Sequence, residues 1–219
     1  DLHSFPTRRS SDLEIEYGKQ YGYEFEHEAT YDKMCLVNNA VYVARYAKPE
    51  KCEKLYNYIP KDNKEHPYEW TATGAQFQHP YVFKSLFAKK QISFDDVCET
   101  RAVSAGELYL DMNEDVPEGE HVYHYVGKVG RFCPIIPGRG GGIVYRRKDG
   151  KDYAATNTTG YRWLESEVVK QLGKESDIDQ TFYHRLCKAA VKDISAYGNF
   201  DWFVSDEEYD GALGELPFN

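Results

Sequence analysis

A stretch with an Asp-Gly pair at its centre limits the fold more than any other part of the sequence. In IVYRRKDGKDYAAT, residues 143–156, residues typical of strands flank Asp149-Gly150 on both sides. A type I′ turn needs positive φ at both central residues, and Asp-Gly suits this requirement. The pattern therefore predicts a strand, a two-residue turn and a second strand. Just before it, GRGGG at 138–142 lacks most Cβ atoms, which lets other groups approach its backbone closely.

The hairpin lies in a basic stretch of an otherwise acidic chain. The formal net charge is -9, yet between Tyr123 and Trp163 eight basic residues outnumber two acidic ones, so this stretch carries +6 and the rest -15. Such an island attracts a polyanion locally. On a strand, Arg146 and Lys148 share one face and Arg147 takes the other. The alternative interpretation is a solvated hairpin beside a flexible glycine loop. The basic residues are Lys128, Arg131, Arg139, Arg146, Arg147, Lys148, Lys151 and Arg162.

The first 13 residues, DLHSFPTRRSSDL, resemble the translation of a sequencing-library adaptor fused to an open reading frame. They are polar, rich in Ser and Arg, and show no apolar period. We therefore expect residues 1–13 to be a disordered, non-native tag, and the natural protein to continue upstream of residue 14.

Composition excludes several classes of protein. Aromatic residues make up 15% of the chain, which argues against disorder. No apolar run approaches the roughly 20 residues of a membrane-spanning helix. The five cysteines include no CxxC pair, which supports neither a zinc site nor a disulfide framework and fits a reducing cytosol. We expect a cytoplasmic monomer without a membrane partner.

Alternation of apolar and polar residues predicts antiparallel strands over 14–46, with Tyr21, Tyr23 and Phe25 on one face and a turn at Asn38-Asn39. Residues 48–69 contain three prolines and are predicted to be a surface excursion. Pro80 suits the first position of a helix whose Phe83, Leu86 and Phe87 form a buried face. Ser93 is predicted to cap a further helix.

The second half of the chain mixes loop, hairpin and helix signals. Residues 107–120 are acidic, contain Pro117 and Gly119, and are predicted to be a loop. Trp163, Leu164, Val168 and Leu172 indicate a helix ended by Gly173. A second helix should turn Leu186, Ala190, Ile194 and Tyr197 inward and stop at Gly198. The order of sheet, helix, basic hairpin and helix pair predicts an α+β fold with segregated layers.

A second binding feature is WTATGAQFQHPY, where Gln76 and Gln78 would share one strand face and donate to phosphate oxygens. The alternative is an ordinary polar strand end. GRGGGIVYRR lacks the Gly-Lys-Ser or Gly-Lys-Thr of a phosphate loop. His121 and His124 would point to opposite faces of a strand. The glycine-rich segment and the two histidines therefore predict no active site, and the sequence shows no recognisable Ser-His-Asp pattern.

Two longer segments support a family resemblance. EATYDKMCLVNNAVYVARY with EWTATGAQFQHPYVFKSLF resembles the end of the palm and the start of the thumb in family B DNA polymerases of bacteriophage type. VGRFCPIIPGRGGGIVYRRKDGKDYAATNTTGYRWLESEVV and YGNFDWFVSD resemble the terminal, thumb-side region of that family. In the family's Lys-Lys-Arg-Tyr primer-binding motif, Tyr42 matches, whereas Asn39, Ala40 and Val41 stand at the three basic positions.

The resemblance implies the antiparallel end of a palm over 14–79, then a mostly helical thumb over 80–219 that carries the basic hairpin. It implies primer-template DNA as the partner, with Tyr42, Gln76, Gln78 and the basic residues as contacts, and the cytoplasm of a phage-infected bacterium as the location. The family's Asp-Thr-Asp, which holds Mg²⁺, does not occur in this sequence. We therefore expect no cofactor and no catalytic residue in this chain, although the parent polymerase would use Mg²⁺.

Two alternatives remain open. The chain could be a stand-alone nucleic-acid-binding protein without a polymerase parent. It could also be a carbohydrate- or protein-binding module, which its 19 tyrosines suggest. Salt-dependent duplex binding separates the nucleic-acid hypotheses from the last one.

Overall fold

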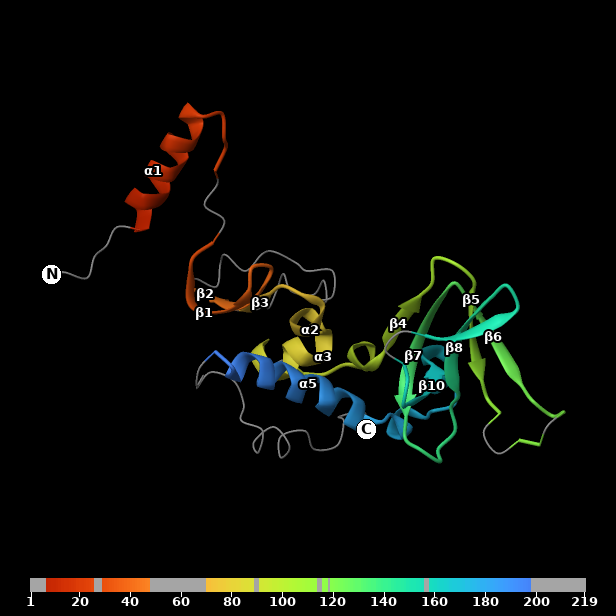
Figure 1. Cartoon of the computed structure of the whole chain (residues 1–219). Helices are drawn as coiled ribbons and strands as arrows, with labels where there is room; N and C mark the ends of the chain where they lie inside the picture. The colour runs from red at the N-terminus through yellow and green to blue at the C-terminus, as the bar shows by residue number, and fades with distance from the viewer. Residues whose placement is uncertain are drawn as a thin grey trace.

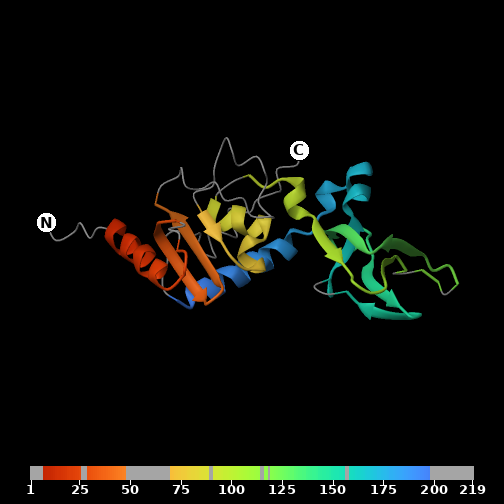
Figure 2. The same cartoon turned by 90° about the horizontal axis from the view of Figure 1, so that it is seen from above.

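The computed structural model shows an α+β fold in which the strands of the described residues all pair antiparallel, which confirms the predicted class. Two lobes lie side by side along an elongated molecule (Figures 1 and 2). The described residues are 7–25, 29–47, 70–88, 91–113, 116–117, 119–155 and 158–197. The predicted surface excursion at 48–69 and the stop at Gly198 lie outside them.

The chain enters through a helix, α1 (Thr7–Gln20), which projects from the rest of the fold in Figure 1. Two predictions are therefore wrong: residues 7–13 are helical, and no strand covers 14–25. The alternation of Leu13, Ile15 and Tyr17 fits a strand, but no neighbouring strand in the described chain pairs with it. A helix satisfies its backbone groups locally and needs no such neighbour. Gly22, at φ 79°, lies in the turn that follows α1.

The first lobe is built on a three-stranded sheet in the order β1-β2-β3, formed by β1 (Tyr31–Asn38), β2 (Val41–Tyr46) and β3 (Trp70–Ala72). The predicted hairpin is present, with its turn one residue later, at 39–40. The Asn38 side chain sets this register, because its Oδ1 accepts hydrogen bonds from the backbone N–H groups of Ala40 and Val41. Val43 and Ala44 are fully buried in this sheet.

Short helices cover the sheet: α2 (Ala75–Gln78), α3 (Pro80–Val82) and the π-helix η3 (Phe83–Ala88). Pro80 begins α3 as predicted, where its missing N–H costs no hydrogen bond, and His79 Nδ1 accepts from the N–H of Tyr81. The three predicted apolar residues, Phe83, Leu86 and Phe87, are buried.

The second lobe contains two sheets. One has the order β10-β7-β4 and the other the order β6-β5-β8-β9. Residues 80–197 thus hold more strands than the expected helical thumb. The elements are the 3₁₀ helix η4 (Phe94–Val97), β4 (Glu99–Ala102), β5 (Glu107–Asp111), β6 (Tyr123–Gly127), β7 (Val129–Ile135), β8 (Ile143–Lys148), β9 (Lys151–Ala154), β10 (Arg162–Glu165), α4 (Ser166–Gln171) and the 3₁₀ helix η5 (Glu175–Asp177).

Three sequence predictions in this lobe need correction or refinement. The start of the segment predicted to be a loop forms β5 instead. Leu108 and Leu110 alternate with more polar residues and point into the core, which is the pattern of a strand. Trp163 and Leu164 belong to β10 rather than to a helix, and they pair with β7. Ser93 is an N-cap as predicted, but the element that it caps is the short 3₁₀ helix η4. The backbone N–H of Ser93 donates to the Asp96 carboxylate.

The long helix α5 (Gln180–Ser195) joins the lobes: it begins beside the second lobe and packs against β1, α2 and α3 of the first (Figures 1 and 2). Tyr183 of α5 stacks on Tyr81 with ring centroids 4.7 Å apart. The hydrophobic core is continuous through both lobes as a result. Ala190 and Ile194 are buried as predicted, whereas Tyr197 is exposed and its hydroxyl donates to the carbonyl of Val37.

Candidate nucleic-acid interface

The β8–β9 hairpin has the turn that its sequence predicts. Asp149 and Gly150 both adopt positive φ, 51° and 72°, and Lys148 pairs with Lys151 across the turn. Asp149 is the only described non-glycine residue with a positive φ. The turn therefore places the two lysines directly opposite each other at the end of the hairpin.

Four cations gather at one end of the β6-β5-β8-β9 sheet. The strand register places the end of β6, the start of β5, the end of β8 and the start of β9 at the same end of the sheet. Lys128, the residue after β6, therefore lies at the end where β8 turns into β9. We call this set the basic end. Its members are Lys128, Arg146, Lys148 and Lys151. Among the described residues none of the four makes an ion pair, although the Arg146 guanidinium lies 5.1 Å from the Tyr153 ring centroid. Three strand spacings of roughly 4.8 Å place about 14 Å between β6 and β9.

Arg147 lies on the opposite face of the sheet and is held there. Its Nε and Nη2 donate to the two carboxylate oxygens of Asp152 at 2.8 and 3.2 Å, and Nη2 also donates to the Tyr145 hydroxyl. The guanidinium lies 4.9 to 5.5 Å from the ring centroids of Tyr109, Tyr123 and Tyr145. The structure thus places Arg147 in a tyrosine cluster, away from the basic end.

Electrostatics in this cluster follow from the same contacts. The hydrogen bonds from Arg147 lower the pKa of Asp152, and the bond to Asp152 raises the pKa of Arg147 further. Burial raises the pKa of Tyr145 to about 12. Both members of the ion pair therefore stay charged at neutral pH, and the tyrosine stays protonated.

The remaining predicted cations are dispersed. Arg131 pairs with Asp95 at 3.2 Å, and Arg139 pairs with Asp177 at 3.1 Å. The glycine loop beside Arg139 approaches its own chain: Gly142 and Trp163 exchange two backbone hydrogen bonds of 2.8 Å. A Cβ on Gly142 would lie 2.6 Å from the carbonyl oxygen of Asp111. The close backbone approach predicted for GRGGG is therefore to β10 and β5.

Tyr42, Gln76 and Gln78 lie in the first lobe, apart from the basic end (Figure 1). The two glutamines do not share a strand face as predicted, because Gly74, at φ 82°, precedes α2 and places both in a helix. Gln78 Nε2 donates to the carbonyl of Ala72, and Gln76 Nε2 donates to Asp193 of α5. Both amides therefore make contacts within the fold.

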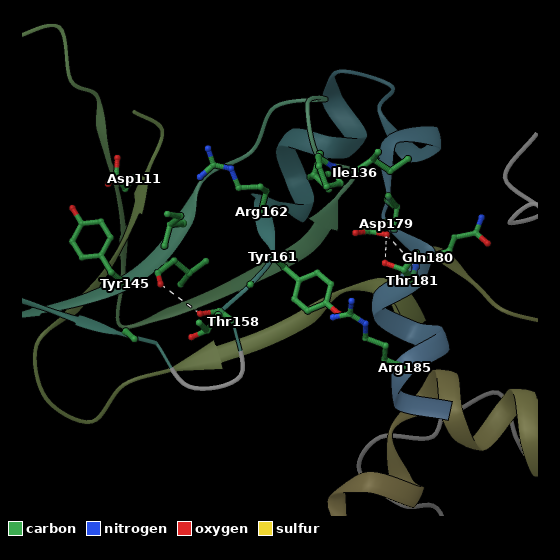
Figure 3. A pocket seen from close by; sticks show the side chains of 18 of the residues that line it. Asp111, Ile136, Tyr145, Thr158, Tyr161, Arg162, Asp179, Gln180, Thr181 and Arg185 are labelled. Atoms are coloured by element: carbon green, nitrogen blue, oxygen red, sulfur yellow. Dashed lines mark hydrogen bonds between the residues drawn. The ribbon is translucent and has the colours of Figure 1, made fainter. Parts of the chain in front are cut away.

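A pocket of about 1020 Å³ lies beside the hairpin, where β7, β8 and β9 meet the loop 158–161, the first residue of β10 and the start of α5. Figure 3 shows Tyr161 and Arg185 pointing toward each other across part of it; Arg185 Nη1 donates to the Tyr161 hydroxyl at 2.6 Å. Asp179 caps α5 by accepting from the N–H and hydroxyl of Thr181. Arg162 also lines the pocket. Its walls come from segments distant in sequence, so no local motif predicts it.

Within the described ranges no three His, Cys, Asp or Glu side chains are grouped to hold a metal ion, and no helix is long and apolar enough to cross a membrane. Comparison with protein-family models, with curated proteins and with solved structures finds no match for this chain.

Proposed function

We propose that the chain binds double-stranded nucleic acid through phosphate contacts at its basic end. The observation that carries the proposal is the Lys148–Lys151 cross-strand pair. Like charges directly opposite each other destabilise a sheet, and no carboxylate of the described chain pairs with either lysine. Phosphates would remove that repulsion. The roughly 14 Å from β6 to β9 corresponds to the rise of about four phosphates along one DNA strand.

The sequence resemblance extends the proposal to a parent protein. We propose that the chain is the C-terminal part of a family B DNA polymerase of phage type, and that its partner is primer-template DNA. The sequence contains no Asp-Thr-Asp to hold the Mg²⁺ that the parent would use. We therefore expect the purified chain to incorporate no nucleotide when it is given Mg²⁺, nucleoside triphosphates and a primed template. Measurable primer extension would contradict this expectation.

The decisive experiment is duplex binding across a salt series, followed by fluorescence anisotropy. Each phosphate neutralised on duplex DNA contributes about 0.9 to the slope of log K against log salt. Changing Arg146 and Lys148 together to alanine should weaken binding to all sequences alike and lower the slope by about one to two units.

A matched control removes the same charge elsewhere. Arg131→Ala with Arg139→Ala deletes two exposed cations that already pair with Asp95 and Asp177. This control should change the salt slope less than the hairpin variant does. If the hairpin variant binds like the unmodified chain at every salt concentration, the basic end is only a solvated surface, and the proposal fails.

One observation favours a second candidate, a carbohydrate- or protein-binding module. Tyr109, Tyr123, Tyr125 and Tyr145 gather on one face of the β6-β5-β8-β9 sheet, and about half of the Tyr123 and Tyr125 surfaces is exposed. Exposed aromatic rings are common in binding surfaces of both kinds. Binding to a glycan or protein that is insensitive to salt and lost in Tyr123→Ala would support this candidate instead.

A further inference from the structure

Two cysteines lie in contact where the lobes join. Cys98 follows η4 and Cys133 lies in β7, and their Sγ atoms are 3.6 Å apart. In the β4–β7 register Glu99 faces Phe132, so Cys98 and Cys133 form the next opposed pair. Opposed residues of antiparallel strands have Cα atoms about 4.5–5.5 Å apart, and a disulfide spans about 4.4–6.8 Å. The backbone therefore needs little movement to allow a bond between them.

The surroundings make the two thiols unequal. The hydrogen bond with Cys133 lowers the pKa of Cys98; burial opposes this effect, the cations Arg131 and Lys170 add to it, and Asp95 counteracts it. The same hydrogen bond and burial raise the pKa of Cys133. Cys98, which is partly exposed, is therefore the thiol that more readily becomes a thiolate, although its Sγ also lies 3.1 Å from the Phe94 carbonyl oxygen, whereas Cys133 is fully buried and holds its proton more tightly.

We propose that Cys98 and Cys133 are a site of thiol–disulfide exchange whose co-substrate is a small anionic disulfide of the glutathione type. Cys98 thiolate attacks one sulfur of glutathione disulfide, which forms a mixed disulfide and releases one glutathione thiolate. Cys133 then loses its proton and attacks Cys98 Sγ, which forms the Cys98–Cys133 bond and releases the second glutathione thiolate. Two protein thiols are oxidised, one glutathione disulfide is reduced, and the two protons released by the cysteines go to solvent or to the leaving thiolates.

Position and charge favour this pair over the other described cysteines. Cys35 and Cys187 are buried, and burial raises the pKa of Cys35. By contrast, Cys98 is partly exposed and has two cations nearby. Arg131 already pairs with Asp95, whereas Lys170 makes no ion pair within the described residues and would attract a carboxylate of glutathione. The inference depends on the thiol geometry and is independent of nucleic-acid binding.

The new bond would close a loop between positions 35 residues apart. A loop of that size constrains the unfolded chain, and we expect the oxidised protein to melt about 5–15 °C higher than the reduced one. Reduction by dithiothreitol should reverse the shift.

Peptide mapping after incubation of the full chain with glutathione disulfide tests the proposal. The expected product is a Cys98–Cys133 linked peptide, with the remaining cysteines still open to alkylation after denaturation. Cys133→Ser should stop at a glutathione adduct on Cys98, whereas Cys98→Ser should leave the buried Cys133 unmodified. The proposal is overturned if wild-type protein stops at the Cys98 adduct, links either cysteine to another partner, or leaves both thiols free. The wild-type result decides even if a serine variant folds poorly.

Discussion

The ion pair between Lys84 and Asp96 offers the sharpest test of how the fold is held together. Lys84 in η3 donates to Asp96 Oδ2 at 2.8 Å, and their side chains are 8% and 3% exposed. The same oxygen accepts from the backbone N–H of Ser93 at 2.7 Å and from its hydroxyl. The pair therefore ties the helical layer of the first lobe to η4, where the chain enters the second.

Removing one partner should cost far more than removing both. Lys84→Met leaves a buried carboxylate without its cation, a change that typically costs about 3–5 kcal/mol. The Ser93 hydrogen bonds remain, so we expect the lower end, about 3 kcal/mol, or a fall in Tm of about 6–12 °C. In Lys84→Met with Asp96→Asn no buried charge is left alone. The free-energy cost of this double variant should therefore be well below the sum of the two single changes.

Urea unfolding of the four proteins measures the coupling free energy directly. Asp95→Asn is the control, because it breaks the neighbouring exposed pair with Arg131 and should cost less than about 1 kcal/mol. If Lys84→Met costs no more than Asp95→Asn, or if the two single changes simply add, the buried pair does not stabilise this junction and the reasoning is refuted.

Two further predictions concern a pair of glycines and one carboxylate. Gly150→Ala meets no neighbouring atom and should cost only about 1 kcal/mol in urea unfolding for its positive φ. Gly106→Ala, at a similar φ, places a Cβ 2.4 Å from the Arg147 carbonyl oxygen and should cost more than about 2 kcal/mol. Equal costs for the two variants would contradict this steric argument. Burial raises the pKa of Glu99, but the 2.7 Å hydrogen bond from His79 and nearby positive charge outweigh it and hold the pKa below its usual range. Glu99 therefore stabilises the fold above its unfolded pKa, and this contribution is lost as pH falls through the lower folded value. Glu99→Gln should flatten the acid side of the stability profile, and an unchanged acid slope would count against this account.

Features that depend on near neighbours in the chain could be predicted from the sequence. The hairpin at Asp149-Gly150, the start of α3 at Pro80 and the buried Phe83 face all follow from steric preferences over a few residues. The alternation of apolar and polar residues at 14–25 predicted a strand, and this prediction was wrong. A strand forms only where a partner strand is present to pair with it, and the sequence pattern does not reveal the partner.

The candidate site divides in the same way. The sequence alone predicts a basic hairpin and the two faces of its strand, because side chains alternate with period two. The fold sets which cations of the described residues pair with a carboxylate: the strand register places Asp152 beside Arg147, and contacts between distant segments place Asp95 beside Arg131 and Asp177 beside Arg139. The pocket and the Cys98–Cys133 contact likewise join distant segments. Charge and turn type are local properties, whereas pairing partners depend on how the whole chain packs.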